Sequence, residues 1–178
     1  NKDGPYIECD LPRPLNIYGW SKLMGERMAM EQNPNTFILR TAWLFGSVGR
    51  NFPKTILALA REKEEICVVN DQWGTPSYVG DLARQIELLM DTKSYGLYHC
   101  TSQGGCTWHD YAREIIRLAG LQVRVVPMVS SDYTRPARRP ANSVLDNLML
   151  RAQGLDVMPE WKDSLARHIG EIMEPLKK

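Results

Sequence analysis

Apolar and polar positions along the chain follow two different periods. Apolar residues three or four positions apart predict helices, and short apolar runs bounded by turn residues predict strands. The pattern predicts helices over 16–32, 51–63, 79–90, 107–119, 143–150 and 161–173, and strands over 36–45, 66–69, 96–100 and 121–126. Strands that alternate with helices are typical of an α/β fold with a parallel sheet.

Two of these elements carry more specific expectations. The helix over 16–32 should bury an apolar stripe formed by Ile17, Met24 and Met28. The strand over 36–45 is mostly apolar along its length, which is typical of a strand covered on both faces of a parallel sheet.

Turn and cap residues delimit the remaining segments. Residues 1–15 are rich in Pro and charged residues, and we expect them, together with 72–77 and 127–142, to be irregular. Asn51 and Thr107 are expected to cap the helices that follow them, because their side chains can accept a hydrogen bond from a free backbone N–H.

Composition and charge narrow the class of protein. The 178 residues, with 43% hydrophobic and 24% charged residues, suit a soluble domain with a buried core. A net charge of +1 gives no electrostatic reason to expect nucleic acid or an anionic membrane as a partner. The four cysteines lack C-x-x-C spacing and fit a reducing compartment, so we expect a cytoplasmic protein.

Tyr18 and Lys22 lie four residues apart at the start of the first predicted helix. Side chains at positions i and i+4 share one face of a helix. A cation about 4 Å from a phenol, at an effective dielectric of about 20, favours the phenolate by about 4 kcal/mol. A lysine ammonium in that position would therefore make the phenol useful for proton transfer near neutral pH. A solvated Tyr and Lys on an ordinary helix is the alternative interpretation.

Other catalytic patterns are absent from the sequence. No glycine-rich phosphate loop follows a predicted strand, and there is no nucleophile elbow. His99, His109 and His168 have no ligand spacing, so the residues themselves predict no metal site.

Seven collinear stretches resemble the dTDP-4-dehydrorhamnose reductase family of extended short-chain dehydrogenases. PLNIYGWSKLMGE at 14–26 resembles the active-site helix of those dehydrogenases. The others, in the order that the family has them, are LRTAWLFG at 39–46, NFPKT at 51–55, VNDQWGTP at 69–76, GLYH at 96–99, TWHDYA at 107–112 and RPANSVLD at 139–146. Together they cover nearly the whole chain.

The resemblance implies a fold and a division into domains. The chain would be the C-terminal part of a Rossmann-like doubly wound parallel sheet plus a small α/β substrate-binding domain. Residues 1–70 would end the NADP-binding domain and residues 71–178 would mainly bind substrate, with some interleaving. The N-terminal cofactor half, with its glycine-rich loop and catalytic Ser or Thr, would lie upstream of this sequence.

The resemblance also implies a reaction. It is the NADPH-dependent reduction of the C4 keto group of dTDP-4-dehydro-L-rhamnose to dTDP-L-rhamnose, for cell-surface polysaccharide biosynthesis, with NADH as an alternative cofactor. Tyr18 would donate the proton to the C4 oxygen, and Lys22 would activate Tyr18 and hydrogen-bond the nicotinamide ribose. Tyr18, Lys22 and Thr41 would all contact the cofactor. The alternative for Thr41 is a strand residue with a satisfied hydroxyl.

Four further residues would bind the dTDP-sugar. Trp43 would lie beside the sugar, at the end of a parallel strand where open α/β sheets bind ligands. Asn51 and Phe52 open a helix whose N-terminus suits a diphosphate, and Arg139 offers a guanidinium to phosphate. The alternatives are core packing for Trp43, capping and packing for Asn51 and Phe52, and a solvated loop arginine for Arg139. Trp108 is interpreted as the first-turn anchor of its helix.

Two other functions remain open at this stage. One is a non-catalytic regulatory or binding subunit with the same fold, and the other is a nucleotide-sugar epimerase or dehydratase, which shares Tyr-x-x-x-Lys. Family resemblance alone further allows Mg²⁺ and a homodimer.

Overall fold

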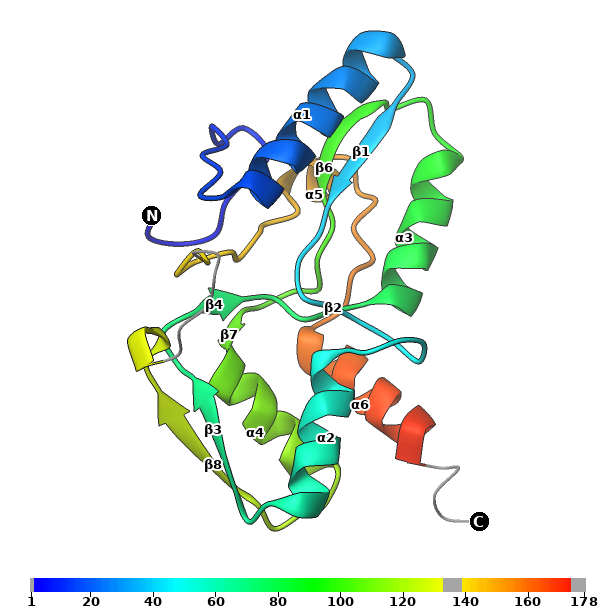
Figure 1. Cartoon of the computed structure of the whole chain (residues 1–178). Coiled ribbons are helices and arrows are strands. Elements are labelled where there is room, and N and C mark those ends of the chain that lie inside the picture. The colour runs from blue at the N-terminus through cyan, green and yellow to red at the C-terminus, as the bar shows by residue number, and fades with distance from the viewer. Residues whose placement is uncertain (1, 133–138, 174–178) are drawn as a thin grey trace.

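The computed structural model describes residues 2–132 and 139–173. Their helices and strands are arranged around two hydrophobic clusters, one above the other in Figure 1. The upper cluster in Figure 1 has α1 (Ile17–Gln32), α3 (Val79–Met90) and α5 (Leu148–Ala152) around β1 (Phe37–Arg40) and β6 (Gly96–His99). The lower cluster has α2 (Phe52–Glu62), α4 (Trp108–Leu118) and α6 (Trp161–Met173) with β3 (Glu65–Val69) and β8 (Arg124–Met128). Between them lie the short strands β2 (Leu44–Phe45), β4 (Trp73–Gly74), β5 (Ser77–Tyr78) and β7 (Cys106–Thr107).

The strands pair in twos, and three of the four pairs are parallel. β1 pairs with β6, β2 with β5, and β3 with β8, while β4 and β7 are antiparallel. Parallel strands need a long crossover between them, and the chain makes one in each parallel pair. The predicted α/β class with parallel pairing is therefore confirmed.

Cap residues explain why most helices begin where the sequence predicts. Asn16 Oδ1 accepts a hydrogen bond from Gly19 N at 2.8 Å, and Asn51 Oδ1 accepts one from Lys54 N at 3.1 Å. Thr107 and Asp110 form a reciprocal capping box at the start of α4. Each cap satisfies a backbone N–H that has no partner within its helix. Five of the six predicted helices are confirmed to within one residue at each end.

The predicted continuous strand over 36–45 is wrong. It breaks at residues 41–43, where Trp43 adopts a positive φ of 45° and separates β1 from β2. As a result the two parts pair with different strands, β1 with β6 and β2 with β5.

Three further boundaries differ from the prediction. The strand expected over 121–126 is β8, which begins three residues later and includes residues 127 and 128 of the predicted loop 127–142. Residues 133–138 of that loop lie outside the described residues. The segment 72–77 includes β4 and the start of β5 rather than loop alone. Only the end of the predicted helix 143–150 is helical, because residues 144 and 146 form backbone hydrogen bonds with Tyr6 instead.

The buried stripe predicted for α1 is also wrong. Ile17 is 87% exposed and Met28 is 60% exposed, while Leu23 is the buried residue of the helix. Glu26 of the helix forms an ion pair with Arg40 at the end of β1. The predicted stripe of Ile17, Met24 and Met28 is exposed in the described part of the chain.

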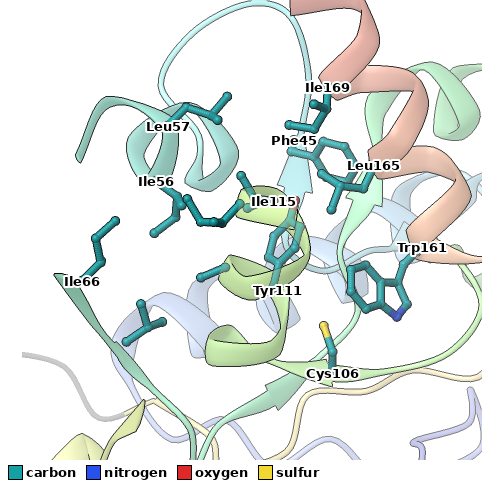
Figure 2. Packing of buried hydrophobic residues seen from close by; sticks show 13 residues of the cluster. Phe45, Ile56, Leu57, Ile66, Cys106, Tyr111, Ile115, Trp161, Leu165 and Ile169 are labelled. Atoms are coloured by element: carbon teal, nitrogen blue, oxygen red, sulfur yellow. The ribbon is translucent and has the colours of Figure 1, made fainter. Parts of the chain in front are cut away.

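The lower cluster holds the larger core. Phe45, Tyr111, Ile115 and Leu165 are almost completely buried there, and Figure 2 shows them converging from β2, α4 and α6. The burial follows the helical spacing of α4, whose Tyr111, Ala112, Ile115 and Ile116 all face inward. Burying each large apolar side chain contributes about 1.5–3 kcal/mol, so this core fixes α4 against its neighbours.

Glu8 joins three separate segments of the upper cluster. Its buried Oε1 accepts hydrogen bonds from His99 N at 2.9 Å and Met149 N at 3.2 Å. The His99 ring nitrogen Nδ1 lies 3.1 Å from Tyr6 O and 3.2 Å from Asp146 O. Burial lowers the pKa of His99, although the nearby Glu8 carboxylate opposes that shift. Glu8 therefore ties the segment before α1 to β6 and to the start of α5.

Replacing Glu8 should test that connection. In Glu8→Ala two backbone N–H groups lose their acceptor, at about 1–3 kcal/mol for each buried group. We expect the free energy of unfolding of the full-length protein to fall by about 2–4 kcal/mol, measured by urea denaturation. Glu8→Gln keeps an acceptor oxygen and should lose less than half of that amount. Equal losses in the two variants would contradict this role.

Candidate functional site

Tyr18 and Lys22 lie together on the first turns of α1. Lys22 Nζ is 5.5 Å from the centre of the Tyr18 ring. The Tyr18 side chain is 71% exposed, and Lys22 is exposed as well. The structure therefore brings the two residues onto one face, as their spacing predicts, and leaves the phenol accessible.

An ion pair attaches this helix to the end of β1. Arg40 Nε and Nη2 donate to the two Glu26 carboxylate oxygens at 2.9 and 2.6 Å, and both side chains are largely buried. A bidentate guanidinium–carboxylate pair is among the strongest polar contacts in proteins and fixes orientation as well as distance. Because Thr41 follows Arg40, the pair sets the position of the Tyr18 helix relative to Thr41.

The Thr41 hydroxyl has the property expected of a ligand-binding group. Its Oγ1 is buried and has no hydrogen-bond partner among the described residues. A buried hydroxyl without a partner costs about 1–3 kcal/mol, and a ligand hydroxyl or amide could remove that cost. Thr41 thus departs from the alternative of a strand residue with a satisfied hydroxyl.

Trp43, two residues after Thr41, belongs to an aromatic cluster. Its indole stacks on the indole of Trp108, with ring centres 3.5 Å apart and planes 12° from parallel. The Phe52 ring packs on the rings of Trp108 and Tyr111, with ring centres 4.7 and 5.1 Å apart. Trp108 is therefore more than the helix anchor that the sequence indicated, since it joins the start of α4 to two predicted substrate residues.

The side chain of Asn51 is used within the protein. Its Oδ1 caps α2, and its Nδ2 donates to Gly46 O at 2.6 Å. Both polar groups of the amide therefore have partners, as in the alternative of simple capping. Asn51 holds the start of α2, and with it Phe52, in place.

A groove of about 960 Å³ lies beside the aromatic cluster. It runs along α2 and β3, and its lining includes Leu15, Phe52, Lys63, Gln72, Trp108 and Arg139. Leu15 is three residues before Tyr18, so the groove reaches the segment that leads into α1. Aromatic side chains and cations in one groove can bind a ligand with a flat ring and phosphate groups.

Sequence reasoning missed several residues of this groove. Lys63 is the C-cap residue of α2 and lines the groove from there. Ser130 and Ser131 follow β8, and the pairing of β8 with β3 brings them to the groove. A tryptophan directly after a capping threonine was the available clue to Trp108. The structure places Arg139 and Phe52 in the groove, whereas Tyr18, Lys22, Thr41 and Trp43 are outside its lining.

The described residues contain no group of three or more His, Cys, Asp or Glu side chains that could hold a metal ion. No helix among them is both long and apolar enough to cross a membrane.

Comparisons with known proteins agree with one another. The family model described as RmlD substrate binding domain matches residues 1–174. A dTDP-4-dehydrorhamnose reductase of Shigella flexneri is 37% identical over 97% of this chain and 61% of that protein. The crystal structure of a dTDP-4-dehydrorhamnose reductase from Clostridium acetobutylicum superimposes with a TM-score of 0.94 at 43% identity, covering 97% of this chain and 61% of that one.

A third relative was solved with a cofactor. The dTDP-4-dehydrorhamnose reductase of Bacillus anthracis, in complex with NADP, superimposes with a TM-score of 0.89 at 42% identity, over 94% of this chain and 59% of that one. The chain thus spans about three fifths of the length of these relatives. Their Rossmann-like α/β fold is the fold of the described residues.

The Glu26–Arg40 pair provides a test of how α1 is fixed. A double-mutant cycle with Glu26→Gln and Arg40→Gln should give a coupling free energy of about 1–2 kcal/mol, measured by urea denaturation of the full-length protein. The control is the ion pair of Glu65 and Arg124, whose side chains are 41% and 74% exposed, so that solvent screens it. A coupling in the first cycle no larger than in the control would show that the pair does not hold the helix.

Proposed function

Because the chain belongs to the dTDP-4-dehydrorhamnose reductase family through its RmlD substrate binding domain, we propose that it forms the substrate-binding part of an NADPH-dependent reductase. The reaction is the reduction of the C4 keto group of dTDP-4-dehydro-L-rhamnose to the hydroxyl of dTDP-L-rhamnose. The product would serve the biosynthesis of cell-surface polysaccharide. The observation that carries the proposal is the exposed Tyr18–Lys22 pair on a helix whose leading segment lines a groove with aromatic and cationic walls.

Tyr18 is the proton donor in this proposal. Its hydroxyl hydrogen goes to the C4 oxygen while C4 receives a hydride, so that the carbonyl becomes an alcohol. The Lys22 ammonium near the ring stabilises the phenolate that remains. The phenolate then regains its proton from solvent, which the exposure of Tyr18 permits.

The cofactor side of the site is formed by Tyr18, Lys22 and Thr41. Bound NADPH would supply the hydride, and NADH is the alternative. The buried Thr41 hydroxyl, which has no hydrogen-bond partner in the described part of the chain, fits such a group, since a hydrogen bond to it would satisfy the hydroxyl. Lys22 would hydrogen-bond the nicotinamide ribose. The glycine-rich loop expected of the family does not occur in this sequence.

The substrate side is formed by Trp43, Phe52 and Arg139, with Asn51 in support. Arg139 offers the groove a guanidinium that matches a phosphate. Phe52, which packs on Trp108, presents a ring face on which a base or sugar can pack. Trp43, stacked on Trp108, would lie beside the sugar. Asn51 acts by capping the helix that carries Phe52.

The wider organisation follows the same proposal. Residues 1–70 would complete the NADP-binding domain and 71–178 would mainly bind substrate, although the lower core draws residues from both ranges. All four cysteines are free thiols, as suits a cytoplasmic protein. The apolar residues exposed on α1 are suited to cover by upstream sequence or by the second copy of a homodimer.

Replacing the phenol tests the chemical step. Tyr18→Phe in the full-length protein should abolish reduction, because the ring keeps its shape but has no proton to donate. NADPH affinity should stay within a few-fold, measured by fluorescence titration. Tyr95→Phe, a change in an exposed tyrosine that packs on Phe37, is the matched control and should leave turnover intact. Turnover by Tyr18→Phe at the wild-type rate would remove Tyr18 from the mechanism.

Replacing Arg139 tests the substrate side. Arg139→Gln should raise KM for the dTDP-sugar about tenfold or more, because hydrogen bonds between charged groups contribute about 1.5–3 kcal/mol. KM for NADPH should not change. Arg84→Gln alters an exposed arginine on α3, away from the groove, and should leave both constants unchanged. The Arg139 assignment is wrong if its replacement affects KM no more than the control does.

A further inference from the structure

Trp43 adopts a backbone conformation that its side chain disfavours. It is the one non-glycine residue at positive φ in the described part of the chain, with φ 45°. A bulky residue rarely adopts this conformation. Such strain persists where the surrounding structure determines the conformation, and it is concentrated at ligand sites. The neighbours of Trp43 should therefore show what holds it.

Gly74 approaches the Trp43 indole so closely that no side chain would fit. A β-carbon at Gly74 would lie 2.2 Å from Cε2, 2.5 Å from Cζ2 and 2.6 Å from Nε1 of Trp43. Real Cβ atoms essentially never approach other heavy atoms within 3.0 Å. Trp108 stacks on the same indole with ring centres 3.5 Å apart. Gly74 and Trp108 thus both contact the ring directly.

One short sheet fixes both of these neighbours. Gly74 pairs with Cys106 in the antiparallel β4–β7 pair, and Trp108 follows the next residue of β7, Thr107. The capping box that begins at Thr107 sets the start of α4 and so the direction of the Trp108 side chain. The position of Gly74 relative to Trp108 is therefore rigid, and the Trp43 indole has to fit both.

The backbone of Trp43 is fixed from a second side. Ser77 N donates to Trp43 O at 3.2 Å, at the start of the pairing between β2 and β5. Ser77 is only three residues beyond Gly74. The segment 74–77 therefore contacts both the indole and the backbone of Trp43.

We infer that Gly74 and Trp108 are positioning residues that hold the Trp43 indole against the wall of the groove and thereby set how tightly the sugar is bound. Trp108 lines the groove, and the Trp43 indole, although outside that lining, stacks directly on Trp108. Gly74 acts by having no side chain, and Trp108 by presenting a ring face. The inference rests on the proposed function, in which Trp43 lies beside the sugar.

The Gly74→Ala variant of the full-length protein tests the inference with two measurements. The first is circular dichroism, because two stacked indoles give a coupled pair of bands that disappears when they separate. The second is kinetics, in which we expect KM for dTDP-4-dehydro-L-rhamnose to rise about tenfold or more because a small misplacement weakens binding steeply. KM for NADPH should stay within about twofold of wild type.

Further variants make the test specific. Gly170→Ala on α6 is the matched control, because a β-carbon there would meet no heavy atom within 4 Å, and it should keep both the bands and KM. In a Trp43→Ala background, Gly74→Ala should have no further effect on KM, because the ring it displaces is gone. If Gly74→Ala fails to fold, Trp108→Ala repeats the kinetic test alone, because it removes one of the two indoles and with it the bands. In a Trp43→Ala background Trp108→Ala should likewise have no further effect on KM, and Trp108→Phe, which keeps a ring face, should restore most of the affinity.

The outcomes separate this inference from the proposed function. Coupled bands that persist in Gly74→Ala would contradict the close fit, whatever the enzyme reduces. Loss of the bands with an unchanged KM for the sugar would contradict the positioning role. If the wild-type protein does not reduce the dTDP-sugar, the proposed function and the kinetic part of the inference both fail, while the bands still test the packing of the indole.

Discussion

The turn at Trp43 is the constraint on which the rest of the structure depends. It directs β1 into the upper cluster and β2, whose Phe45 belongs to the lower core, toward the lower cluster, although only residues 41–43 separate the two strands. The segment before the turn contains Thr41 and Arg40, and the ion pair of Arg40 with Glu26 attaches the helix that carries Tyr18. The lower side leads to Phe52 and the groove. A turn this sharp in a bulky residue needs the support that Gly74, Ser77 and Trp108 give it.

Local chemistry made much of the fold predictable, and tertiary contacts made the rest unpredictable. Asn16, Asn51 and Thr107 cap helices through contacts with their own neighbours, so the sequence is sufficient to predict those boundaries. The break at Trp43 has no glycine or proline to mark it, and it is fixed by residues more than thirty positions away. Residues 143–147 failed as a predicted helix for the same reason, since their backbone partners lie at Tyr6 and Trp73.

The candidate site, like the fold, could be predicted from the sequence only in part. The four-residue spacing of Tyr18 and Lys22 predicts their shared face, and the structure shows it. The roles of Thr41, Trp43 and Arg139 came from family resemblance, because nothing in their local pattern separates a binding residue from a strand or loop residue. What the structure adds is specific to each of them: a buried hydroxyl without a partner, an indole stacked on Trp108, and a place in the groove.

The central claim is that the Tyr18 helix and the aromatic groove serve one reaction, the reduction of a dTDP-4-keto sugar. The most direct test is the absorbance change of NADPH when the full-length protein is mixed with dTDP-4-dehydro-L-rhamnose. The account predicts oxidation of NADPH that depends on the sugar, with dTDP-L-rhamnose formed in equal amount. NADPH that binds but is not oxidised when the sugar is added would contradict it and would favour a non-catalytic binding subunit.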